Sequence, residues 1–159
     1  MPARPSFLIV GDTNQDGNQD LVVGSAYSQT VAILLGNGRT LEAPTSTPLA
    51  GTAHPSLAED FDRDGQMDLV NRDALGGAIE VLPGERPGEF GRPLRFVVGR
   101  APQALATGDF DRDGRVDIAV ADRAGQTIAI LLNDSPRPQP TRGRAGRSAS
   151  LASATGAPH

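Results

Sequence analysis

Three aspartate-rich segments at nearly equal intervals constrain this chain more than any other feature. Each has the pattern Asp-x-Asp/Asn-x-Asp-Gly-x-x-Asp and runs directly into a short apolar stretch. Their first aspartates, Asp12, Asp60 and Asp109, lie 48 and then 49 residues apart. A period of this length predicts a solenoid or a propeller built from one repeated supersecondary unit.

Apolar runs around each segment predict short β-strands. One strand is expected before the aspartates, as at Phe7–Val10, and a second directly after them. A third is expected ten residues after the last aspartate, at Thr30–Leu35, Ala78–Leu82 and Thr127–Leu132. Weaker fourth strands are expected around Pro48–Ala50 and Leu94–Val98. Four short strands in each unit predict an all-β fold of propeller blades with almost no helix.

The repeats are predicted to cover residues 7–134, divided at about 7–53, 54–100 and 101–134. The third unit shows no fourth strand, so its blade is expected to be incomplete. Residues 135–159 contain Pro, Arg, Ser and Ala but no acid. We expect this tail to be disordered, because its composition cannot bury enough apolar surface to offset the entropy of ordering.

Composition excludes several functional classes. Cysteine is absent, which rules out disulfides, thiolate metal sites and a cysteine nucleophile. All 19 acids lie in residues 1–134, and this acidic body argues against nucleic-acid binding. No apolar stretch approaches the roughly 20 residues of a membrane span. No signal-peptide pattern precedes Phe7, so the chain is expected to be cytosolic as written or to lack its true N-terminus.

Carboxylates at positions 1, 3, 5 and 9 of each segment suit a hard divalent cation. Ca²⁺ takes six to eight oxygen ligands in flexible geometry, and a backbone carbonyl at position 7 supplies another. Glycine at position 6 tolerates the sharp turn. We therefore expect up to three Ca²⁺ sites, with these ligands: Asp12, Asn14, Asp16, the Asn18 carbonyl and Asp20; Asp60, Asp62, Asp64, the Gln66 carbonyl and Asp68; Asp109, Asp111, Asp113, the Arg115 carbonyl and Asp117. The first loop should bind most weakly, because Asn14 removes one charge.

An EF-hand is the competing interpretation of these loops. It requires a bidentate glutamate at position 12 and flanking helices. Position 12 is occupied here by Val23, Asn71 and Val120, and each loop leads into a strand-like run. The loops are therefore not expected to be EF-hands.

The unit Gly-Asp-Phe-Asp-x-Asp-Gly-x-x-Asp-Ile-Ala-Val, followed by Thr-Ile-Ala-Ile-Leu-Leu, resembles the FG-GAP/VCBS repeat. This repeat builds the β-propellers of integrin α subunits and of many bacterial secreted proteins, and the resemblance covers about residues 7–134. It implies Ca²⁺ in the loop between the first two strands of each blade and an extracellular or cell-surface location. Thr13 departs from the pattern, since it replaces the phenylalanine of the other two loops.

The function expected from these features is a non-catalytic binding or adhesion scaffold with a protein or glycan ligand. A lectin-like carbohydrate-binding module and an accessory region of a larger secreted enzyme are the alternatives. Catalysis is not expected, because the paired carboxylates repeat in every blade and lysine is absent. Propellers close with about four to eight blades. Three blades would leave open edges, so the remaining blades would come from a longer chain or from self-association.

Overall fold

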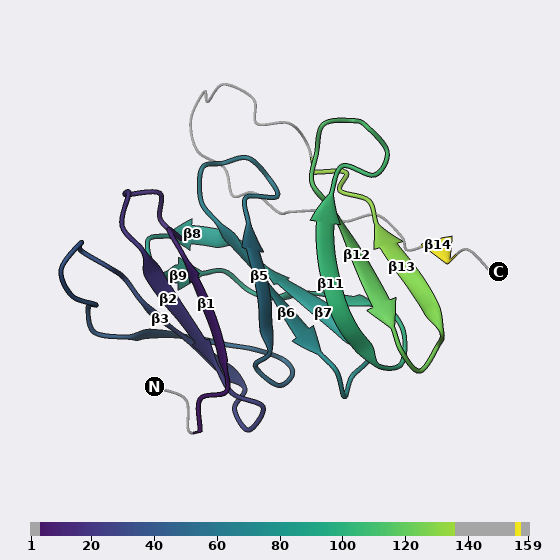
Figure 1. Ribbon diagram of the computed structural model, residues 1–159, viewed down its shortest axis with the longest axis horizontal. Coiled ribbons are helices and arrows are strands. Elements are labelled where there is room, and N and C mark those ends of the chain that lie inside the picture. Colours follow the sequence, from purple (N-terminus) through teal and green to yellow (C-terminus); the bar gives the residue numbers. More distant parts are fainter. Residues whose placement is uncertain (1–3, 136–154, 157–159) are drawn as a thin grey trace.

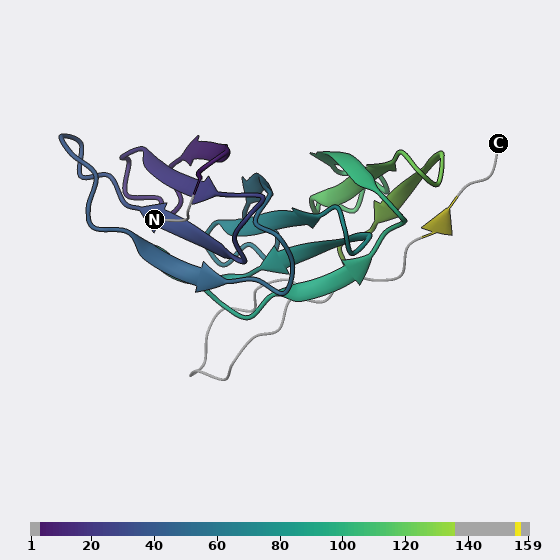
Figure 2. The same cartoon turned by 90° about the horizontal axis from the view of Figure 1, so that it is seen from below.

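The computed structural model describes residues 4–135 and 155–156, and these form three four-stranded antiparallel sheets with one small hairpin. The sheets follow one another in chain order (Figure 1), and seen from below they form an open arc (Figure 2). This arrangement confirms the predicted all-β fold of a partial propeller. The part of the chain described by the structure contains no helix that is long and apolar enough to cross a membrane.

All three sheets repeat one up-and-down topology. The first sheet consists of β1 (Phe7–Gly11), β2 (Asp20–Gly24), β3 (Thr30–Leu34) and β4 (Thr45–Pro48). The second consists of β5 (Pro55–Glu59), β6 (Asp68–Asp73), β7 (Ala78–Leu82) and β10 (Leu94–Val97), with the hairpin of β8 (Gly84–Arg86) and β9 (Glu89–Phe90) inserted before β10. The third consists of β11 (Pro102–Gly108), β12 (Asp117–Asp122), β13 (Thr127–Leu131) and β14 (Thr155–Gly156).

Two fourth strands differ from the predictions. β4 ends at Pro48, where the predicted strand begins. The prediction missed the residues that pair with β3, because Thr45–Thr47 are polar and carry no apolar signal. The third sheet was expected to lack a fourth strand, but the short β14 pairs with Ile130 and Ala129 of β13. Two residues are too few to show a periodic pattern. The other residues of the predicted tail, 136–154 and 157–159, lie outside the described residues.

The apolar core lies between the faces of adjacent sheets. Side chains alternate between the two faces of a strand, so each sheet can pack on both neighbours. Between the first and second sheets, Ile33 of β3 shares a cluster with Leu69 and Leu82. Between the second and third, Val81 of β7 shares a cluster with Ile118. Packing of sheet faces therefore joins the repeats.

Candidate metal centres

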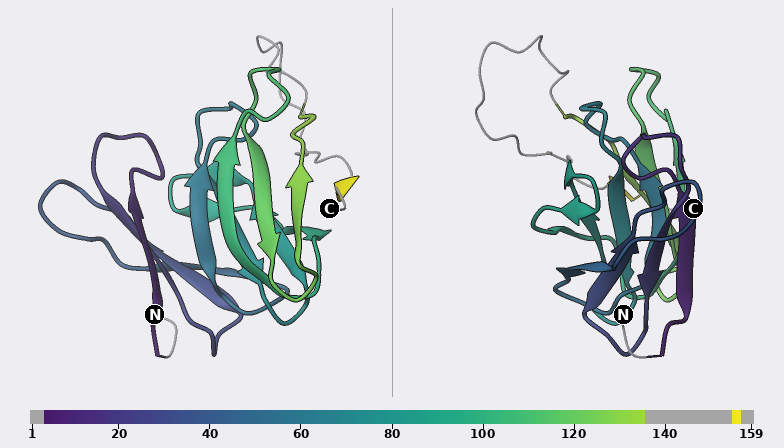
Figure 3. Two further views of the ribbon diagram at one scale, coloured as in Figure 1. Left: turned by 45° about the vertical axis from the view of Figure 1, so that its right-hand side comes forward. Right: turned by 90° about the vertical axis from the view of Figure 1, so that its left-hand side faces the viewer.

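The three predicted loops connect β1 with β2, β5 with β6 and β11 with β12, and they lie at the same end of the sheets (Figure 3). Their backbones share one conformation. At position 6, Gly17, Gly65 and Gly114 have φ of 89°, 88° and 85°, which glycine adopts without the strain imposed by a Cβ. Position 4 is also left-handed in each loop, with φ of 56°, 59° and 63° at Gln15, Arg63 and Arg112. The predicted role of the glycine is thus matched by the backbone.

The first carboxylate of each loop holds the turn closed. In the third loop, Asp109 accepts hydrogen bonds from the amides of Asp113 (3.1 Å) and Gly114 (2.9 Å). The Oδ1 atom of Asp111 accepts from the same Asp113 amide at 3.1 Å. The first and second loops repeat these three bonds at 2.8–3.1 Å. The side chains at positions 1 and 3 are therefore oriented by the backbone of their own loop.

The last carboxylate of each loop is a buried anchor. Asp117, only 1% exposed, accepts hydrogen bonds from the amides of Phe110 and Asn133, both at 2.8 Å. Asp20 and Asp68 are equally buried and make the same pair of backbone contacts. These bonds tie the loop to the residue two positions after the end of the third strand of its sheet.

The partners of this anchor were missed by sequence reasoning. Gly36, Gly84 and Asn133 each stand 16 residues after the last aspartate, and this repeated spacing was the available signal. Asn133 also donates from its side chain to the carbonyls of Phe61 (2.7 Å) and Val116 (3.1 Å). The third loop is thereby linked to the second.

Three carboxylates of the predicted ligand set come together in the second loop and three in the third. Carboxylate oxygens of Asp60, Asp62 and Asp68 all lie within 4.8 Å of one another, and so do those of Asp109, Asp111 and Asp117. Positions 1, 3 and 9 thus form an all-oxygen cluster in the second and third loops. This donor set fits a hard cation, because Ca²⁺ is bound by oxygen atoms and carboxylates so close together repel one another without a counter-charge.

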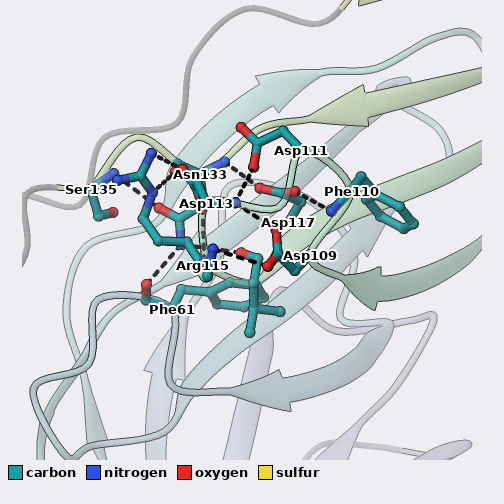
Figure 4. A network of polar contacts seen from close by, with 11 residues as sticks. Phe61, Asp109, Phe110, Asp111, Asp113, Arg115, Asp117, Asn133 and Ser135 are labelled. Atoms are coloured by element: carbon teal, nitrogen blue, oxygen red, sulfur yellow. Dashed lines mark hydrogen bonds and ion pairs between the residues drawn. The ribbon is translucent and has the colours of Figure 1, made fainter.

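The carboxylates at position 5 have other partners. Asp64 and Asp113 accept hydrogen bonds from the amides of Gln66 and Arg115, each at 2.8 Å. Asp113 also forms an ion pair with the guanidinium of Arg115, which in turn donates to the Asn133 carbonyl (Figure 4). In the third loop, the residue at position 7 thus supplies a cation to one of the predicted ligands. A ligand role for the position-7 carbonyls stays a prediction.

In the second loop, the pKa of the buried Asp68 is raised by burial and by neighbouring acids. Burial raises the pKa of Asp68 to about 7, against the amide hydrogen bonds from Gly84 and Phe61 that lower it. The neighbouring carboxylates of Asp62 and Asp60 raise it further. A proton or a metal cation would relieve this repulsion.

The first loop has the same framework with less charge. The Oδ1 atom of Asn14 accepts from the Asp16 amide, as the aspartates at position 3 do in the other loops, and its Nδ2 donates to Asp16 at 3.1 Å. The amide of Asn18 also donates to Asp16 at 2.8 Å. These bonds from Asn18 and Asn14 lower the pKa of Asp16. Asparagine at position 3 therefore preserves the loop while removing a carboxylate.

Comparison with known families supports the resemblance carried by these loops. Residues 12–71, which contain the first two aspartate loops, match a family model described as an FG-GAP-like repeat. No curated protein and no solved structure gave a significant match. The third loop lies outside the matched segment but repeats its hydrogen bonds. The predicted family is thus confirmed at residues 12–71, which are similar to the FG-GAP-like repeat.

Proposed function

We propose that this chain is a non-catalytic binding scaffold whose aspartate loops are stabilised by Ca²⁺. The observation that carries the proposal is the pair of carboxylate clusters at positions 1, 3 and 9 of the second and third loops. Backbone amides hold each of these side chains in place before any ion arrives. The match of residues 12–71 to the FG-GAP-like repeat, a family whose members are generally scaffolds, supports the non-catalytic role.

Asp60, Asp62 and Asp68 would hold one ion, and Asp109, Asp111 and Asp117 a second. The first loop would bind more weakly, because Asn14 offers a neutral oxygen. A bound ion would neutralise the acids and stiffen the turn between the first two strands of a sheet. At a free Ca²⁺ concentration tenfold above Kd, each site would stabilise the fold by about 1.4 kcal/mol.

An extracellular or cell-surface location and a protein or glycan partner belong to the same proposal. Extracellular calcium modules bind with Kd of about 10⁻⁴–10⁻³ M, which suits the calcium level outside cells. An adhesion role would then present the loops and the open sheet surfaces to that partner.

Thermal unfolding of the full chain in Ca²⁺ and in chelator tests the metal sites. We expect Ca²⁺ to raise the melting temperature. Asp62→Asn and Asp111→Asn should each reduce this rise, because they remove one carboxylate while keeping the oxygen that accepts from the backbone. Asn14 shows that this replacement is compatible with the loop. Conversely, Asn14→Asp should increase the rise.

Glu42→Gln serves as the matched control, since it removes an exposed acid outside the loops. It should leave the calcium response unchanged. A melting temperature that is indifferent to Ca²⁺ would overturn the proposal, as would equal responses of the loop variants and the control.

A further inference from the structure

Adjacent sheets use one repeated set of positions to pack on the sheet that follows. In the second sheet, Phe61, Ile79 and Val81 lie in the cluster shared with the third sheet. In the first sheet, Val31 and Ile33 stand at the positions of Ile79 and Val81 and pack on the second sheet. Along the third strand this forward face is apolar in every repeat, whereas the first repeat has Thr13 at the position of Phe61.

Among the described residues, no sheet follows the third, and its forward face is partly open to solvent, with Ala119 and Ile130 half-buried. Its residues are the counterparts, 49 positions on, of those in the second sheet: Ala106, Phe110, Ala119, Ile128 and Ile130. Phe61 is 3% exposed, but Phe110 is 48% exposed. Likewise, Ile79 is fully buried whereas Ile128 is 58% exposed.

The opposite face of the first sheet, its rear face, is open along β1. It is less exposed along β2 and β3, where Leu21 and Leu34 are half-buried and Val23 and Ala32 are buried. This rear face contains Leu8, Val10, Leu21 and Leu34, which are neighbours across β1, β2 and β3. In the third sheet, the counterparts of Leu8, Leu21 and Leu34 are Leu105, Ile118 and Leu131, and these pack against the second sheet. Leu8 and Val10 are instead 64% and 65% exposed.

We infer that the forward face of the third sheet docks on the rear face of the first sheet in a second copy of this chain. The chain carries both halves of the interface that joins its own sheets, one at each end of the arc (Figure 2). Each open face would therefore contact the same kind of sheet face that already packs between the first and second sheets and between the second and third. The sequence led us to expect open strand edges at the two ends of the array. In the structure, the two ends instead expose sheet faces.

Two copies docked in this way at both ends form a closed dimer. The contact joins unlike surfaces, so it either closes into a ring or extends without limit. The four-stranded sheets described in one chain number three, so two copies place six of them in the ring, within the range of about four to eight at which propellers close. Closure buries the exposed side chains of both faces, which are Leu8, Val10, Phe110 and Ile128.

The mass of the full chain in solution tests this inference, with Ca²⁺ present throughout. We expect a dimer with twice the chain mass of 16.5 kDa, dissociating on dilution. Leu8→Glu and Ile128→Glu alter the rear and forward faces respectively. Each should weaken the dimer about tenfold or more, because a charge is buried without a partner. Leu75→Glu is the matched control, since Leu75 is 87% exposed and lies in the turn between β6 and β7.

Mixing the two variants distinguishes this docking from other forms of association. In a mixed pair, one interface combines two unaltered faces, so the mixture should associate more tightly than either variant alone. The inference would be overturned by a wild-type monomer at every concentration, or by a ladder of larger species. An association weakened by only one of the two variants would also overturn it. Circular dichroism of each variant must show the wild-type fold, and Leu8→Ala and Ile128→Ala replace any variant that fails.

Discussion

At the scale of single residues, the neighbours of His54 disfavour its charged form. Its Nδ1 lies 3.1 Å from Nη2 of Arg72, and because arginine only donates, the imidazole must accept. The ring also lies against Phe7, with ring centroids 4.3 Å apart. Burial lowers the pKa of His54, and the charge of Arg72 lowers it further against the opposing effect of Asp73.

This environment predicts a pH dependence of stability. A histidine whose pKa is lowered by folding contributes stability above its unfolded pKa of about 6.5, and this is lost as the pH falls through the folded value. Chemical unfolding of metal-free protein should therefore show that the wild type loses more unfolding free energy than His54→Asn as the pH falls below that point. Asp68 has a raised pKa and acts in the opposite direction, but it is present in both proteins and cancels in the difference. Parallel pH profiles would contradict the assignment.

At the scale of elements, each aspartate loop is attached to its sheet by its last carboxylate. Asp20 accepts from the amides of Thr13 and Gly36, both at 2.8 Å, and is 1% exposed. Asp16 also accepts a backbone amide, but it lies at the surface. Asp20 therefore satisfies buried backbone amides, whereas Asp16 satisfies an amide near the surface.

Asp20→Ala should destabilise the metal-free protein much more than Asp16→Ala. The first variant leaves two buried amides unsatisfied, each costing about 1–3 kcal/mol. The second removes an exposed acceptor, and surface changes of this kind usually stay within about 0.5 kcal/mol. Urea unfolding in chelator measures this difference apart from metal binding. Equal losses would show that the last carboxylate is not an anchor.

At the scale of the whole molecule, the position of a sheet in the arc decides the environment of equivalent residues. Phe61 and Phe110 occupy the same position in their loops, yet only Phe61 is covered by a following sheet. Phe61→Ala should cost about 3–5 kcal/mol, the usual loss for a buried phenylalanine. Phe110→Ala should cost about 1 kcal/mol or less in dilute protein, since the half-exposed ring loses less burial. Similar losses, measured by urea unfolding, would contradict face-to-face packing of the sheets.

Local chemistry explains why much of the fold and of the loops could be predicted. Apolar runs indicated β1, the strand after each aspartate segment and the next strand along the chain. The positions of β5 (Pro55–Glu59) and β11 (Pro102–Gly108) were implied only by the repeat. Glycine at position 6 was expected to make the sharp turn, and all three glycines have positive φ. The fourth strands were less predictable, because the pairing residues Thr45–Thr47 and Thr155–Gly156 carry no apolar alternation.

The sequence by itself determined the period, the strands next to the aspartates and the acids available to a cation, because these depend on residue types at short spacing. Only the tertiary structure decided which carboxylates meet. Asp62 and Asp64 look equivalent in the motif and each accepts a backbone amide, but it is Asp62 that lies in the cluster with Asp60 and Asp68. Tertiary structure also decided which apolar faces are covered, because burial depends on a neighbouring sheet that lies almost 50 residues away along the chain.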